Sequence, residues 1–169
     1  MIHLTEVVDY QCPYCRQLNR WTRELPQNLT DRLLVSYVNF PLPMHNWARS
    51  AALAAICAEQ QGPIRFARVQ ERLYDLQSLG PGMEITPSVV ASELNLNDDS
   101  PSSALVPANA ECFSSATTVT RLDKEFALAD ELHIAKTPTI FINGNRVEVT
   151  SEDEFHKAIA QAQDKLKRN

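Results

Sequence analysis

Two cysteines three positions apart, Cys12 and Cys15, are the residues of this sequence best suited to chemistry. An apolar run that predicts a buried strand over residues 2–10 precedes them. An amphipathic pattern that predicts a helix from residue 12 to about 29, bent or ended near Pro26, follows. Because helix positions three apart share a face, the two sulfur atoms can meet. The spacing predicts a dithiol that opens and closes while it exchanges disulfides with other proteins.

The junction between strand and helix favours Cys12 as the more reactive thiol. The thiolate is the attacking species in disulfide exchange. At the start of a helix the first backbone N–H groups lack partners and the dipole adds positive charge, so a sulfur anion is stabilised there. Cys15 lies one turn inside the helix, where it can attack a mixed disulfide formed at Cys12. Pro13 suits the first helical position.

A CxxC pair can also bind zinc, but a closed structural zinc site needs four ligands. The other two cysteines, Cys57 and Cys112, are far apart in the sequence, and the four histidines are scattered. The pattern therefore favours a redox dithiol that needs no cofactor beyond its own disulfide and no metal. A non-enzymatic metal-binding module and two incidental thiols are the alternatives.

The composition is that of a globular protein of 169 residues with a net charge of −5. No basic patch with interleaved aromatic residues predicts nucleic-acid binding, and no apolar run approaches the ~20 residues that span a bilayer. No signal-peptide pattern precedes the first strand, so the protein is expected to be cytoplasmic or to work elsewhere after removal of a leader.

The order of the predicted elements indicates an α/β fold with a helical insertion. A second strand over residues 32–40 completes a parallel βαβ unit. Helical patterns then continue to residue 134. An Asn143-Gly144 turn next predicts a hairpin, and a last helix follows it. We expect a domain formed by residues 1–40 and 135–169, with residues 41–134 as an inserted helical lobe.

Two polar residues near the dithiol have two interpretations each. Glu6 interrupts the apolar strand, so it either faces solvent or is a buried carboxylate that exchanges the proton of Cys15. His45 either lines the active-site groove or caps the following helix, and we favour the cap.

Together these motifs resemble the DsbA-like thiol–disulfide oxidoreductases of the thioredoxin superfamily. The resemblance covers nearly the whole chain and rests on four stretches: Glu6 to Gln11 leading into Cys12-Pro13-Tyr14-Cys15; Asn39-Phe40-Pro41-Leu42 with His45 and Ala48; Ala54 to Gly62; and Thr137 to Gly144. It implies a thioredoxin fold with a helical insertion between its βαβ and ββα halves.

The resemblance also implies roles for single residues. Cys12 would be the exposed nucleophile, Cys15 the resolving thiol and Glu6 the buried proton acceptor. The Thr137–Pro138 bond would be cis and lie beside Cys12, which leaves the Thr137 backbone free to pair with an extended substrate chain. Pro13 and Tyr14 would join Thr137 and Pro138 in contacting substrate.

Relatives often carry cysteines at the places of Cys57 and Cys112, so the resemblance implies a structural disulfide between them. The alternative is two buried free thiols, which pack as small apolar side chains.

The resulting prediction is an enzyme that oxidises cysteines of unfolded or other cysteine-containing proteins and is reset by a redox partner. Two features leave a reductase, an isomerase or a glutathione-coupled enzyme as alternatives. One is the Pro-Tyr pair between the two thiols, and the other is Thr137, the residue before Pro138. We expect a monomer. The resemblance favours a periplasmic or other extracytoplasmic location, with the cytoplasm as the alternative.

Overall fold

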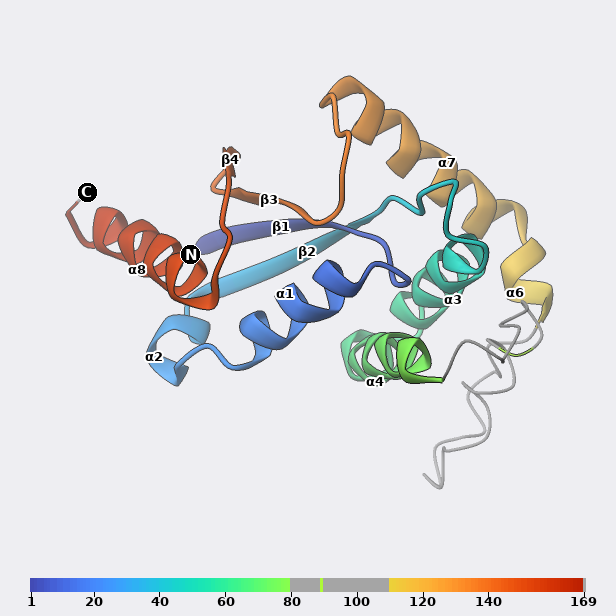
Figure 1. Ribbon diagram of the computed structural model, residues 1–169, viewed down its shortest axis with the longest axis horizontal. Coiled ribbons are helices and arrows are strands. Elements are labelled where there is room, and N and C mark those ends of the chain that lie inside the picture. The colour runs from blue at the N-terminus through green and yellow to red at the C-terminus, as the bar shows by residue number, and fades with distance from the viewer. Residues whose placement is uncertain (80–88, 90–109, 169) are drawn as a thin grey trace.

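The structure is a computed structural model that describes residues 1–79, 89 and 110–168 (Figure 1). Its centre is a four-stranded sheet in the order β2-β1-β3-β4. The strands are β1 (Ile2–Val8), β2 (Leu33–Asn39), β3 (Thr139–Ile142) and β4 (Asn145–Val147). β1 pairs with β2 in parallel, β3 pairs with β1 in antiparallel fashion, and β4 returns antiparallel to β3. The predicted βαβ unit and the hairpin at Asn143-Gly144 are both confirmed.

Helix α1 (Pro13–Arg23) connects the parallel strands, and α8 (Glu152–Arg168) follows the hairpin. Both pack on one face of the sheet (Figure 1). Leu18 and Phe155 lie there in a core with Ile2 and Leu4. Val7 points to the opposite face, where Ala129 packs against it. Side chains alternate along a strand, so Glu6 follows Ile2 and Leu4 onto the face that α1 covers.

The helix expected to run to about residue 29 is shorter, because α1 ends at Arg23. A separate turn, α2 (Gln27–Thr30), begins after Pro26. The residue before a proline is driven out of the helical region, which breaks the helix at Leu25. The predicted first strand likewise ends at Val8, before the turn that leads to Cys12.

The helical insertion lies between β2 and β3, which confirms its predicted place in an α/β fold. It contains α3 (Ala48–Glu59), α4 (Pro63–Asp75), the 3₁₀ helix η1 (Leu76–Ser78), α6 (Ala110–Ser114) and α7 (Ala116–Glu131). α3 is rich in alanine, and its small side chains allow α4 and α7 to pack closely against it. The division into domains at residues 40 and 135 remains a prediction. None of the helices within the described residues is both long and apolar enough to cross a membrane.

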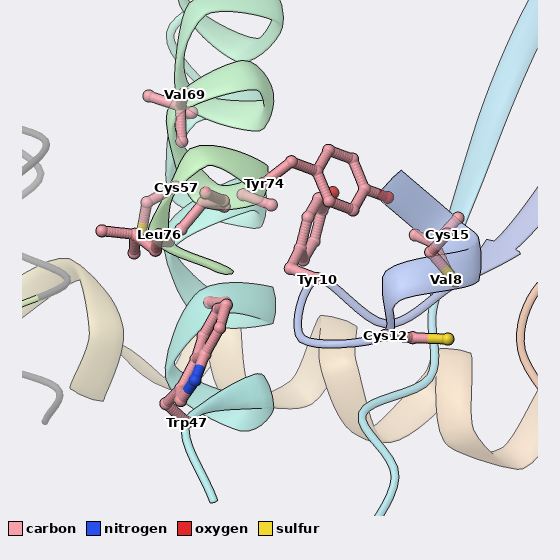
Figure 2. Close-up of a cluster of buried hydrophobic side chains, with 14 of the residues drawn as sticks. Val8, Tyr10, Cys12, Cys15, Trp47, Cys57, Val69, Tyr74 and Leu76 are labelled. Atoms are coloured by element: carbon pink, nitrogen blue, oxygen red, sulfur yellow. The ribbon is translucent and has the colours of Figure 1, made fainter. Parts of the chain in front are cut away.

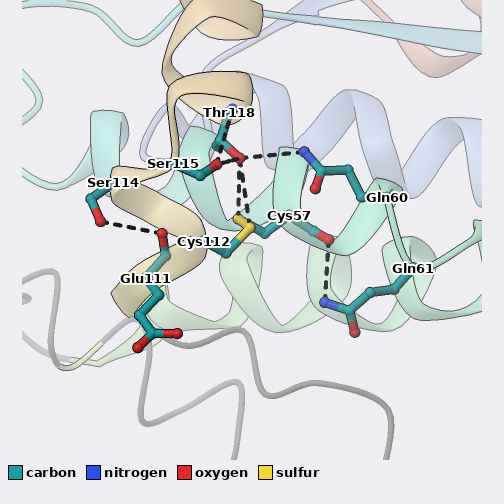
Figure 3. Close-up of a disulfide and its surroundings, with 8 residues drawn as sticks. All are labelled: Cys57, Gln60, Gln61, Glu111, Cys112, Ser114, Ser115 and Thr118. Atoms are coloured by element: carbon teal, nitrogen blue, oxygen red, sulfur yellow. Dashed lines mark hydrogen bonds between the residues drawn. A yellow bond between two sulfur atoms is a disulfide. The ribbon is translucent and has the colours of Figure 1, made fainter.

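A disulfide joins Cys57 of α3 to Cys112 of α6, with 6.1 Å between the Cα atoms (Figure 3). The hydroxyl of Thr118 lies 3.8 Å from the Cys57 sulfur and 3.6 Å from the Cys112 sulfur. The two cysteines are 55 residues apart, so the bond ties a short helix to the centre of the insertion across a long chain segment.

We expect replacement of both Cys57 and Cys112 with alanine to lower the free energy of unfolding by about 4 kcal/mol. The bond restricts the unfolded chain, and this gain grows slowly with the length of the closed loop. Urea unfolding of the double variant and of the single variant Cys57→Ala, each in a Cys12→Ser/Cys15→Ser background, measures the effect. Both variants should lose the same free energy of unfolding, because either substitution removes the disulfide. An unchanged free energy of unfolding would show that the bond contributes nothing to stability.

Candidate active site

Cys12 is the residue that precedes α1 and has an extended backbone conformation, and Pro13 begins the helix. The Cys12 carbonyl accepts hydrogen bonds from the backbone N–H groups of Cys15 and Arg16, at 3.1 and 3.2 Å. The Cys12 N–H donates to the carbonyl of Asp9 at 3.0 Å, which closes the turn between β1 and α1. The sequence thus forms a strand, a turn and a helix, with both thiols at the start of the helix.

The surroundings of Cys12 favour its thiolate. The Cys15 side chain hydrogen-bonds to the Cys12 sulfur, and this contact outweighs burial and lowers the pKa of Cys12 to about 6, with further help from the backbone N–H groups of Cys15 and Tyr14. The Cys12 sulfur also lies 3.5 Å from the Thr137 carbonyl oxygen, to which the neutral thiol donates. Cys12 is only 5% exposed, less than an exposed nucleophile would be.

Cys15 is fully buried (Figure 2). Burial raises the pKa of Cys15 well above its ordinary value, and the hydrogen bond to Cys12 and the charge there act in the same direction. The backbone N–H of Asp9 donates to the Cys15 sulfur at 3.4 Å. The two sulfurs therefore differ strongly: Cys12 is an anion near neutral pH, and Cys15 holds its proton. They are the two free cysteines of the described part of the chain.

Glu6 is fully buried, so the structure excludes the solvent-facing alternative. Its Oε1 atom accepts a hydrogen bond from the Thr22 hydroxyl of α1 at 2.7 Å. Burial raises the pKa of Glu6 from 4.5 to about 7, although the bond from Thr22 acts against this rise. A carboxyl group with such a pKa exchanges protons readily at neutral pH.

The Thr137–Pro138 peptide bond is cis and precedes β3. Two grooves open beside this part of the site. One, of about 350 Å³, contains Tyr14, Thr137 and Pro138 among residues of α1, β3 and the chain after β4. The other, of about 940 Å³, runs between α1 and α4 past Pro13 and Tyr14. Tyr14 is 68% exposed and borders both grooves, whereas Pro13 borders only the second.

The structure therefore brings Cys12, Cys15, Thr137 and Pro138 together and places Glu6 deeper, against α1. Cys57 and Cys112 lie apart, in the helical insertion (Figure 3). Across residues 1–79, 89 and 110–168, no three side chains of histidine, cysteine, aspartate or glutamate gather as ligands for a metal ion.

Asp9 is a further buried residue of this site, and nothing in the sequence alone predicted a role for it. Its Oδ1 atom accepts from the Gln11 N–H, and its Oδ2 atom accepts from the Leu42 N–H and contacts His45 Nδ1, each at 2.7 Å. The capping role favoured for His45 is wrong, because Trp47 precedes α3 and no side chain caps that helix. The signal in the sequence was a carboxylate at the end of an apolar strand, three residues before Cys12.

Comparisons with known proteins agree with this geometry. Residues 2–161 match the family described as Thioredoxin. The Na(+)/H(+) antiporter NhaA 3 of Salinispora tropica is 30% identical over 151 residues, which cover 86% of this chain and 20% of that protein. The chain thus spans about a fifth of the length of the curated relatives it matches.

Solved structures share the fold at low sequence identity. BdbD from Bacillus subtilis is similar with a TM-score of 0.74 and 20% identity, covering 96% of this chain and 88% of that one. The oxidoreductase DsbA from Xylella fastidiosa is similar with a TM-score of 0.68 and 17% identity, and the match covers 99% of this chain and 86% of that one. The chain therefore belongs to the thioredoxin family and has the fold of its DsbA-like thiol–disulfide oxidoreductases.

Proposed function

We propose that the protein catalyses dithiol–disulfide exchange through Cys12 and Cys15, and that its net reaction oxidises cysteines of other proteins. A substrate thiolate attacks the Cys12 sulfur, the Cys12–Cys15 bond breaks, and Cys15 leaves and takes up a proton. A second substrate thiolate then attacks the substrate sulfur of the mixed disulfide and releases Cys12 as a thiolate. The substrate loses two electrons, and the protein gains them as a dithiol.

The lowered pKa of Cys12 is the observation that carries this proposal. An acidic thiol is a good leaving group, and a stabilised thiolate favours the reduced enzyme, so its disulfide is a stronger oxidant. The pKa of about 6 for Cys12 lies between the values of about 7 for thioredoxin and about 3.5 for DsbA. We therefore expect a reduction potential above the value of about −270 mV for thioredoxin.

The surface around Cys12 supports an extended, cysteine-containing chain as the substrate. Thr137 lies two residues before the start of β3, and its carbonyl oxygen faces the Cys12 sulfur. A substrate segment in that position can add to the backbone as a strand does. Tyr14, exposed between the two grooves, offers it an aromatic contact. An oxidant of this kind needs a redox partner that accepts the two electrons and restores the Cys12–Cys15 disulfide.

We propose an extracytoplasmic location and a monomeric state. Structural disulfides such as Cys57–Cys112 persist mainly in oxidising compartments. A periplasmic thioredoxin-like protein from Salmonella enterica serovar Typhimurium is among the similar structures, with a TM-score of 0.73 and 17% identity.

Equilibration of the Cys12–Cys15 pair with reduced and oxidised glutathione tests the direction of the reaction. A potential above that of thioredoxin, together with recovery of active ribonuclease from its reduced form, is expected of an oxidant. Because about 30 mV changes the equilibrium tenfold, the assay separates the alternatives well. A potential near −270 mV, with rapid insulin reduction, would identify a reductase instead.

A further inference from the structure

The helical insertion binds the backbone of the turn that carries Cys12. The carbonyl oxygens of Tyr10 and Cys12 both accept hydrogen bonds from the Nε2 atom of Gln77, at 2.7 and 3.1 Å. A glutamine side chain has two hydrogens on this nitrogen, which is enough for both carbonyls. Gln77 belongs to η1 and follows Cys12 by 65 residues. One side-chain amide thus joins the insertion to the main chain of the nucleophile.

The residue before Gln77 holds this amide in place. Leu76 is 1% exposed and packs in the same apolar cluster as Tyr10, Cys12 and Cys15 (Figure 2). Gln77 itself is half-buried and lines the groove between α1 and α4. The two hydrogen bonds are therefore made from a packed element of the insertion, and the end of the side chain lies where a substitution can be accommodated.

Side chains of the turn itself are bound to the segment before α3. Gln11 donates from Nε2 to the Oδ1 atom of Asn46 and accepts from the Trp47 N–H, each at 3.0 Å. Asp9 contacts the same segment through its carboxylate. Gln77 differs from these contacts because it binds the main chain of the turn. It therefore influences the direction of the peptide groups next to the nucleophile.

The bonds from Gln77 favour the reduced site for two reasons. The Cys12 carbonyl also accepts from the N–H groups of Cys15 and Arg16, so Gln77 helps to fix the first turn of α1. The pKa of Cys12 is lowered first by the Cys15 side chain and also by backbone N–H groups of that turn. In addition, the hydrogens on Nε2 carry partial positive charge beside Cys12, and positive charge favours a sulfur anion.

We propose that Gln77 is a positioning residue through which the helical insertion sets the redox equilibrium of the dithiol. This rests on the proposed function, in which the Cys12–Cys15 pair exchanges with other thiols. Both thiols are free in the structure, so the bonds from Gln77 belong to the reduced protein. In the oxidised protein the Cys12–Cys15 bond holds the same turn covalently. Loss of Gln77 should therefore destabilise the dithiol more than the disulfide.

Exchange with glutathione measures this balance. Two molecules of reduced glutathione give two electrons and two protons to the protein disulfide, and the products are the dithiol and one molecule of glutathione disulfide. Where Cys12 is a thiolate, one of the two protons goes to solvent. Gln77 stabilises the dithiol side of this equilibrium, and it thereby makes the Cys12–Cys15 disulfide a stronger oxidant.

Equilibration of Gln77→Met with reduced and oxidised glutathione tests the proposal. Methionine keeps the length of the side chain and removes the donor. We expect the equilibrium to move about tenfold toward the protein disulfide, which corresponds to a potential about 30 mV lower than that of the wild type. The Cys12 thiolate of the reduced variant should also form at a higher pH. A residue that only stabilised the fold would leave both quantities unchanged.

Gln61→Met is the matched control. Gln61 is a half-buried glutamine of the same insertion, and its Nε2 atom donates to the Cys57 carbonyl at 3.2 Å, beside the structural disulfide (Figure 3). This variant should keep the wild-type equilibrium and the wild-type thiolate titration. An equal equilibrium in Gln77→Met and the wild type would overturn the proposal, and so would an equal shift in the two variants.

A measurement on the wild type decides the matter even if Gln77→Met does not fold. NMR relaxation of the Gln77 side-chain amide in the reduced protein should give an order parameter near the value of about 0.85 for a rigid backbone, and a value below about 0.6 would overturn the proposal. If the wild type did not equilibrate with glutathione at all, the proposed function would fail, and this inference with it. A wild type that equilibrates, together with an unshifted Gln77→Met, would remove this inference alone.

Discussion

Replacing Cys12 with serine is expected to remove thiol–disulfide exchange, lowering kcat/KM by at least about a thousandfold. A serine hydroxyl is a far weaker nucleophile and cannot form the mixed disulfide. The buried Cys15 cannot substitute for it, because burial keeps its proton in place and shields it from substrate. Recovery of active ribonuclease from its reduced form, assayed with wild type and variant at equal concentration, measures the loss.

Cys15→Ser is the matched control for that experiment. It removes the same atom one turn along the helix but leaves the nucleophile, so it should form the mixed disulfide at Cys12 and fail to close it. Mass analysis after acid quenching separates the two behaviours. Equal exchange activity in Cys12→Ser and the wild type would exclude Cys12 from the reaction.

Glu6→Gln is expected to change how stability depends on pH. The pKa of Glu6 is raised from 4.5 to about 7 by burial, so the folded protein binds the Glu6 proton more tightly than the unfolded chain does. The stability that this proton provides is fully present below pH 4.5 and is lost as the pH rises through about 7. A shift of this size corresponds to about 3 kcal/mol. The glutamine variant cannot ionise and should keep that stability.

Urea unfolding of the oxidised protein at pH 4 and at pH 8 measures the effect, since closing the Cys12–Cys15 disulfide removes thiol titration. Glu6→Gln should match the wild type at the lower pH and exceed its free energy of unfolding at the higher one, by up to about 3 kcal/mol. Glu131→Gln, at the exposed last residue of α7, should follow the wild type. A variant less stable than the wild type at pH 8 would contradict a buried carboxylate with a raised pKa.

Local sequence signals predicted most of the thioredoxin half of the chain. The CxxC pair, the apolar strand before it and the Asn143-Gly144 turn each depend on neighbouring residues, and the structure has the βαβ unit and the hairpin where they were expected. In a strand, alternating apolar and polar residues normally distinguish buried from exposed positions. This alternation is weak in β1, because both faces of this central strand are covered. For that reason the sequence left the burial of Glu6 open.

Contacts between distant segments could not be predicted in the same way. Gln77 follows Tyr10 and Cys12, whose carbonyls it binds, by more than sixty residues. The apolar pattern of a helix shows which of its faces is buried, but it does not show which other helix packs against that face. The Asp9 carboxylate contacts His45, more than thirty residues away in the sequence, and also accepts hydrogen bonds from the backbone N–H groups of Gln11 and Leu42. The disulfide between Cys57 and Cys112 was expected from family resemblance and not from spacing.

The proposed chemistry depends above all on the ionisation of Cys12. Thiolate absorbance near 240 nm, followed from about pH 4 to about pH 10 in the reduced protein and in Cys15→Ala, reports the anion at this position. The midpoint should lie near pH 6 in the reduced protein and higher in Cys15→Ala, because alanine cannot donate the hydrogen bond that the Cys15 side chain makes to the Cys12 sulfur. A midpoint at or above the value of about 8.5 for free cysteine would contradict a stabilised thiolate at Cys12.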